Sequence, residues 1–107
     1  AMQLTREHVQ LGYFEFIQRR VNNLLSGELL RIKEDGCANS RDDLVLKFSK
    51  KFMEVIDKQA KEGYKLKSAK VNFIVYWKNE EKEKEVKIVL PELHFEKQLD
   101  VDTKSPM

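Results

Sequence analysis

Few side chains in this 107-residue sequence are of the types that commonly carry out covalent or acid–base chemistry. The chain has one cysteine, Cys37, and two histidines, His8 and His94. A nucleophilic cysteine needs a base within hydrogen-bond reach or another feature that lowers its pKa. The small neighbours Gly36 and Ala38 predict an exposed loop around Cys37, but no spacing brings either histidine to it. We therefore expect an unreactive cysteine and no catalytic residues.

Metal, phosphate and paired-carboxylate sites also lack their usual sequence patterns. A metal site needs several ligands at suitable spacing, and the cysteine and the two histidines lie far apart in the chain. The four glycines are dispersed, so no glycine-rich phosphate-binding loop is predicted. Glu80 and Glu81 fall in a charged turn that would not position them for acid–base work. The sequence predicts no cofactor, no metal and no enzyme.

Charged residues are abundant but nearly balanced, with 20 basic and 18 acidic side chains and a net charge of +2. Residues 41–78 hold ten basic against five acidic residues, so the positive charge lies in the middle of the chain. A basic face with an aromatic ring beside it, Tyr76 or Trp77, could contact nucleic-acid phosphates. The residues of this face would be Lys47, Lys50, Lys51, Lys58, Lys61 and Lys70. Nucleic-acid binding is only the alternative function, because Glu54 and Asp57 interrupt the face and it lacks arginine.

The sequence also carries signals about location. No apolar run approaches the roughly 20 residues that a membrane span requires. The first residues do not combine a basic region with an apolar stretch, so no retained signal peptide is expected. A single cysteine cannot form an internal disulfide, which fits a reducing compartment. We expect an intracellular protein, cytoplasmic or nuclear, that does not span a membrane.

Two helices are predicted in the first 62 residues. The first is capped by Thr5 and ends at Ser26 and Gly27, with apolar residues at three- and four-residue spacing: Phe14, Ile17, Val21, Leu24 and Leu25. The segment 28–33 is ambiguous and is assigned weakly to helix, and residues 34–39 are assigned to a loop.

The second helix is predicted to start near Ser40 and Asp43, which resemble a capping box, and to close at Gly63. It has a wide apolar face that includes Phe48, Phe52, Val55 and Ile56. We expect these four residues to pack on one face of the sheet, formed by Val71, Phe73 and Val75.

From Leu66 the apolar period changes to two, which predicts a strand up to Lys78. A charged turn and a second strand over 86–90 complete an antiparallel hairpin, and Pro91 is expected to end that strand or place it at an edge. The order helix, helix, strand, strand predicts one α+β domain over residues 1–97, with two main helices packed on a small antiparallel sheet. Residues 98–107 are expected to form a polar, flexible tail.

The predicted second strand has few charges to protect an unpaired edge, and such an edge is a template for another chain. We therefore expect a protein–protein interaction or adaptor module that pairs through this edge and an apolar helix surface, with a partner protein or a second copy. The residues expected to bind the partner are Trp77, Val86, Ile88, Val89 and Leu90. Trp77 is the expected aromatic anchor beside the edge.

Overall fold

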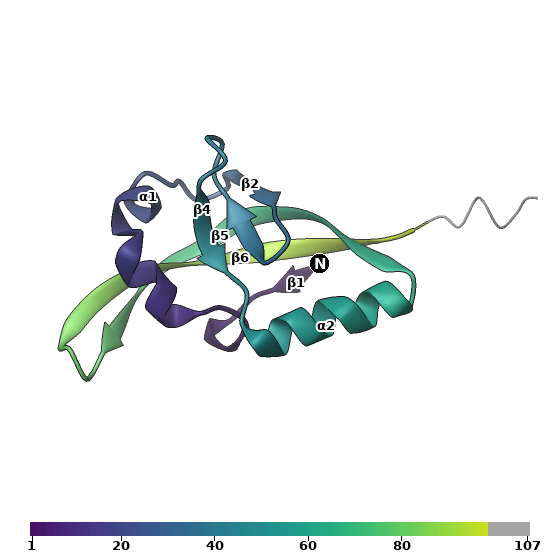
Figure 1. The fold of residues 1–107 in the computed structure, drawn as a ribbon. Helices are drawn as coiled ribbons and strands as arrows, with labels where there is room; N and C mark the ends of the chain where they lie inside the picture. The colour runs from purple at the N-terminus through teal and green to yellow at the C-terminus, as the bar shows by residue number, and fades with distance from the viewer. Residues whose placement is uncertain (99–107) are drawn as a thin grey trace, which may run out of the picture.

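A computed structural model describes residues 1–98, and its main feature is a six-stranded antiparallel sheet that curls into a half-barrel. The strands lie in the order β1-β6-β5-β2-β3-β4 (Figure 1). Their bounds are Met2–Gln3 for β1, Leu29–Ile32 for β2, Gly36–Ala38 for β3, Leu44–Lys47 for β4, Tyr64–Asn79 for β5 and Lys84–Lys97 for β6. The helical segments are the 3-10 helices η1 (Arg6–His8) and η2 (Leu11–Phe16) and the α-helices α1 (Gln18–Asn22) and α2 (Lys50–Lys61).

The predicted α+β fold, with two main helices on a small sheet, is therefore wrong. The structure is 46% strand and 27% helix, and among the described helices only α2 has seven or more residues. The expected order of two helices followed by two strands fails because four short strands precede the hairpin. Short strands buried on both faces carry continuous apolar runs, which sequence periodicity does not distinguish from buried helix.

The first predicted helix is broken into η1, η2 and α1. Val9 interrupts it by forming an antiparallel bridge with Phe48, and the Gln10 N–H donates to the Lys47 carbonyl oxygen at 2.9 Å. These main-chain bonds to a distant segment replace the i to i−4 bonds that a continuous helix would make. The predicted helix is therefore present only as these three short helical segments.

The second predicted helix begins later than expected. The N-cap is Ser49, whose Oγ accepts from the Phe52 N–H at 3.1 Å. The residues before it form β4, in which Val45 and Leu46 are both fully buried. The wide apolar arc assigned to one helix therefore belongs to two elements, a strand buried on both faces and a shorter amphipathic helix.

The segment 28–33, assigned weakly to helix, contains β2, and the loop predicted over 34–39 contains β3. β3 pairs antiparallel with both β2 and β4. Gly36 allows the backbones of β3 and β4 to approach, because a Cβ added to it would lie 2.0 Å from the Leu46 carbonyl oxygen. A glycine that suggested a loop is thus a position of close strand packing.

β5 and β6 form a long antiparallel hairpin that extends past the rest of the sheet (Figure 1). At its turn, Asn79 Oδ1 accepts from the Glu81 N–H at 3.1 Å. β6 does not end at Pro91 but continues to Lys97, with Pro91 opposite Val71. The Val71 N–H bonds Glu28, away from β6, so this pair exchanges no main-chain hydrogen bond and a proline is tolerated there.

The N-terminal segment joins the two outer edges of the half-barrel. β1 pairs with β6 at one edge, and the bridge from Val9 to Phe48 meets the chain just after β4 at the other. After the bridge at Val9, η2 packs against both β4 and β6, and its Phe14 is buried. The sheet is therefore closed by a helical segment rather than by strand pairing.

The expected core is only partly correct. Phe48 and Phe52 are buried, with ring centroids 5.1 Å apart, and Val71 is buried. Phe73 and Val75, which we expected to face α2, are 50% and 37% exposed.

Within residues 1–98, no helix is both long enough and apolar enough to cross a membrane. Except for Gln98, the predicted tail over 98–107 lies outside the described residues.

Candidate functional site

Cys37 is not in an exposed loop but fully buried in β3. Its burial raises the pKa of the thiol to about 12. The thiolate is the nucleophilic form of cysteine, so Cys37 remains an inert thiol near neutral pH. This position argues against cysteine chemistry more strongly than the sequence did.

The two histidines lie in different elements, η1 and β6. His8 Nδ1 accepts from the Thr5 N–H at 2.9 Å, and the ring packs on Phe52 with centroids 5.3 Å apart. His8 therefore caps a turn and covers a core aromatic ring, while His94 is exposed on β6. In the described part of the chain, no group of three or more His, Cys, Asp or Glu residues could hold a metal ion.

The residues predicted to bind a partner along β6 are mostly core residues. Val86, Ile88 and Val89 are at most 3% exposed, and Trp77 and Leu90 are partly buried. The β6 edge is also occupied: Gln18 Nε2 donates to the Lys87 carbonyl oxygen at 2.8 Å, and the Lys87 N–H donates to Gln18 Oε1 at 3.0 Å. One side-chain amide thus supplies at this residue the two bonds that another strand would make.

The opposite edge of the hairpin, along the second half of β5, has a different environment. In the described residues, β2 pairs with β5 only at Ala69 and Lys70, and Gly27 and Glu28 bond Val71. Beyond Val71, residues 72–78 of β5 have β6 on one side, and no strand of the described part of the chain lies on the other.

The main-chain groups along this open edge follow from the register. Tyr76 lies opposite Lys87, whose N–H and C=O both point away from β5 to Gln18. Tyr76 and Lys87 therefore form a non-hydrogen-bonded pair, and the Tyr76 N–H and C=O face the open edge. The same holds two residues away for Ile74 and Lys78. Large apolar side chains beside these groups are exposed, namely Phe73 at 50%, Val75 at 37% and Tyr76 at 67%.

The predicted lysine face is not one surface. Lys47 belongs to β4 and Lys70 to β5, so only Lys50, Lys51, Lys58 and Lys61 share α2. Lys47 Nζ lies 5.0 Å from the centroid of the Tyr13 ring, and Lys51 Nζ lies 2.6 Å from Glu7 Oε1. At about 100° per residue, Glu54 falls within the arc of the helical lysines and Asp57 lies just beside it. This arrangement is typical of a solvated helix face and does not favour nucleic-acid binding.

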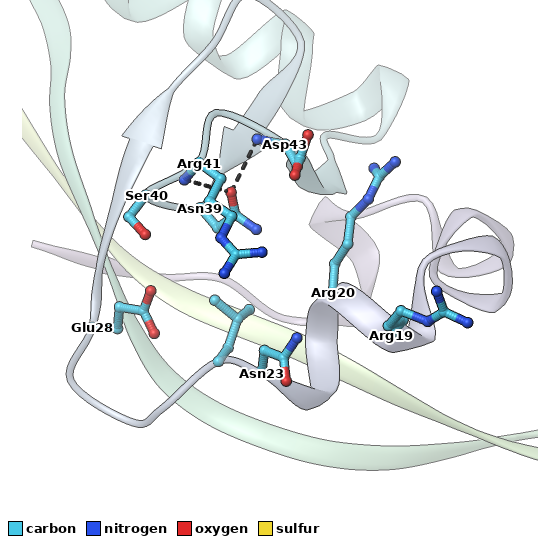
Figure 2. A pocket seen from close by; sticks show the side chains of 9 residues that line it. Arg19, Arg20, Asn23, Glu28, Asn39, Ser40, Arg41 and Asp43 are labelled. Atoms are coloured by element: carbon cyan, nitrogen blue, oxygen red, sulfur yellow. Dashed lines mark hydrogen bonds between the residues drawn. The ribbon is translucent and has the colours of Figure 1, made fainter.

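A cleft that sequence reasoning missed lies between α1 and the loop that joins β3 to β4 (Figure 2). Its volume is about 520 Å³. The residues that line it are Arg19, Arg20, Asn23, Leu24, Glu28, Asn39, Ser40, Arg41 and Asp43. The only signal in the sequence is the scarcity of arginine, because the chain has five arginines against 15 lysines.

Hydrogen bonds from Asn39 and Arg20 fix the shape of this cleft. Asn39 Oδ1 accepts from the Arg41 N–H at 2.9 Å and from the Asp43 N–H at 3.0 Å, which orders the loop (Figure 2). Arg20 Nη1 donates to the Leu44 carbonyl oxygen at 2.9 Å and so ties α1 to β4. The two walls of the cleft are held at a set separation by these bonds.

Comparisons of the chain with protein-family models, with curated proteins and with solved structures found no match. Two surfaces of the described residues present distinct chemistry. The open edge of β5 offers main-chain donors and acceptors beside exposed apolar side chains. The cleft offers guanidinium groups.

Proposed function

We propose that this chain is a protein–protein interaction module that pairs an extended strand with the open edge of β5, and that a second copy of the chain supplies that strand. The observation that carries the proposal is the stretch 72–78, whose outer edge pairs with no strand of residues 1–98 and which combines outward main-chain groups with exposed Phe73, Val75 and Tyr76. Strand addition to an exposed edge is a common mode of protein recognition. The pairing edge proposed here is that of β5 and not the expected edge of β6, because the Gln18 side chain already bonds the Lys87 main chain on β6.

The open stretch is self-complementary. Val75 is its middle residue, so antiparallel pairing about Val75 uses the whole stretch from both copies. In this register Ile74 lies opposite Tyr76 of the second copy, and both have their main-chain groups on the edge. These residues become hydrogen-bonded pairs, and the two Val75 residues become a non-hydrogen-bonded pair.

The side chains also suit this register. Phe73 of one copy would lie opposite Trp77 of the other, flanking the two Val75 residues on one face. Cross-strand pairs of aromatic and β-branched residues stabilise antiparallel sheets. Lys78 would lie opposite Asn72, so no like charges face each other.

A cysteine crosslink tests both the dimer and its register. In a non-hydrogen-bonded pair the Cα atoms are about 4.5 Å apart, which is within the range of about 4.4–6.8 Å for a disulfide. We expect Val75→Cys to form a disulfide-linked dimer under mild oxidation. The native Cys37 is buried and free, so it should not compete.

Tyr76→Cys is the matched control, because the two introduced cysteines would be diagonal neighbours about 7–8 Å apart and should not crosslink. Sedimentation equilibrium of the unmodified protein should show a concentration-dependent dimer that Tyr76→Pro removes, since proline deletes the outward N–H. A strict monomer at all micromolar concentrations, with no Val75→Cys crosslink, would show that a second copy is not the occupant.

The broader form of the proposal, strand addition by another protein, has its own test. Extended peptides selected from a random library should bind the native protein and Tyr76→Thr, which keeps the N–H, but not Tyr76→Pro. If no such peptides are found and the protein is a monomer, the module itself is wrong.

We also propose that the protein is intracellular. Cys37 is the only cysteine and is a free thiol. Compartments that keep thiols reduced are where unpaired cysteines are most common.

A further inference from the structure

The basic residues that line the cleft between α1 and the β3–β4 loop are all arginines. Three of the five arginines in the chain line it, Arg19, Arg20 and Arg41, and none of the 15 lysines does. Arginine presents a planar fork of donors that matches phosphate and carboxylate oxygens, whereas lysine is a flexible point charge. The distribution of the two residue types therefore separates this cleft from the lysine-rich surface elsewhere.

The three guanidinium groups are not neutralised by the protein itself. Within residues 1–98, none of them has a carboxylate within 4.0 Å. Two nearby acids are engaged elsewhere: Asp42 Oδ1 lies 2.7 Å from Lys33 Nζ, and Glu28 Oε1 accepts from the Leu25 N–H at 3.1 Å. Three arginines against Glu28 and Asp43 leave the lining with a net positive charge.

The arginine side chains also differ in how they are held and in where they point. Arg20 is held by its bond to Leu44 and forms part of one wall, whereas the side chain of the neighbouring Arg19 extends away from Arg41 (Figure 2). Arg41 comes from the opposite wall and extends into the cleft (Figure 2). Its main-chain N–H is fixed by Asn39, so the side chain starts from an ordered position. A ligand in the cleft can be contacted from both walls.

We propose that this cleft binds a phosphate monoester, with Arg41 and Arg20 as its charged donors and Ser40 and Asn23 as neutral ones. A phosphate accepts several charge-assisted hydrogen bonds from different directions, while one arginine fork satisfies a carboxylate. The cleft volume of about 520 Å³ is far larger than a phosphate group. The group is therefore carried on a larger molecule, either a small phosphorylated metabolite or a phosphorylated side chain.

Nitrogen-15 NMR titration with inorganic phosphate is the first test, against sodium chloride at equal ionic strength. We expect saturable shifts of the Arg41 and Asp43 amides, with a dissociation constant on the order of millimolar. Shifts that chloride reproduces, or that concentrate on the α2 lysines, would overturn the proposal.

Substitutions of Arg41 then show whether binding depends on the planar guanidinium group or only on the positive charge. Arg41→Gln should weaken phosphate binding about tenfold, and Arg41→Lys, which keeps the charge, should also weaken it several-fold. Arg19→Gln should weaken it less. Arg6→Gln removes an exposed arginine outside the cleft and should leave affinity within about twofold. Equal effects of Arg6→Gln and Arg41→Gln would mean that only overall charge matters, and the site would be rejected.

Two further arms identify the source of the phosphate. AMP is compared with adenosine, and a phosphoserine peptide is compared with its unphosphorylated form. Tighter binding than inorganic phosphate in one arm, lost in Arg41→Gln, assigns the source. If neither compound binds more tightly than inorganic phosphate, the claim that the cleft recognises a larger phosphorylated molecule is wrong. This outcome is independent of pairing at β5, because the variants lie outside residues 72–78.

Discussion

The two halves of β5 are both rich in apolar side chains, yet they lie in different surroundings. In the first half, Leu66, Ala69 and Val71 are at most 9% exposed. In the second half, Phe73, Val75 and Tyr76 are 37–67% exposed. The first half pairs with β2 as well as β6, whereas within residues 1–98 the second half pairs with β6 alone. The comparison shows that neighbouring elements, not the apolar content of the strand, determine which half is core and which is available to a partner.

The largest effect is expected at Phe52 in α2, the helix that contacts β5. Phe52 is fully buried against Phe48 and His8, so Phe52→Ala should lower the free energy of unfolding by about 3–5 kcal/mol. Phe73→Ala, the matched change in the open half, should cost less than about 1 kcal/mol, because half of that side chain is already exposed. Urea denaturation midpoints measure both. Equal losses would mean that Phe73 contributes as much to the core as Phe52.

This difference could not be predicted from the sequence. The alternation of Val71, Phe73 and Val75 correctly indicates a strand, but it does not say where β2 stops beside it. That boundary depends on the β2–β3–β4 meander, whose short strands were assigned to a helix and a loop. Residues buried on both faces, such as Val45 and Leu46, have no period that separates strand from helix.

The candidate sites show the same limit. Scarcity of arginine is visible in the sequence, but Arg41 and the α1 pair are brought to one cleft only by the path of those short strands. Gln18 gave no signal, because a glutamine on a predicted helix surface has no distinctive pattern. The hairpin was predictable, since period-two alternation and a charged turn are local features of the sequence.

A change at Gln18 should reduce the difference between the two edges of the hairpin. Its side-chain amide makes both bonds to the Lys87 main chain. Gln18→Ala should cost about 1–2 kcal/mol, since it leaves partly buried main-chain groups without partners. Hydrogen exchange at the Lys87 amide should become faster, and Asn22→Ala, an exposed change on the same helix, should leave it unchanged. Unaltered exchange in Gln18→Ala would show that another group covers this edge.

The smallest effect is expected at Glu15, which joins η2 to the turn of the hairpin. Its carboxylate accepts from Asn79 Nδ2 at 2.8 Å and from Lys82 Nζ at 3.2 Å, and its side chain is 11% exposed. The hydrogen bonds from Asn79 and Lys82 hold the pKa of this carboxyl below its ordinary value of 4.5. A carboxyl whose pKa is lower in the folded state stabilises the fold above its unfolded pKa and loses that contribution as the pH falls through the folded pKa.

Glu15→Gln removes the charge and keeps one acceptor oxygen, so the variant should be slightly less stable than the native protein at pH 7. The difference should shrink as the pH falls below 4.5, because the native carboxyl then becomes protonated and also loses its charge. Urea midpoints measured from pH 7 to pH 3 test this, with Glu80→Gln in the exposed turn as the control that should show little change at any pH. A stability difference at Glu15 that stays constant with pH would mean that the carboxylate charge does not hold the turn to η2. The hairpin would then be anchored by the Gln18 bonds and by apolar contacts to β6.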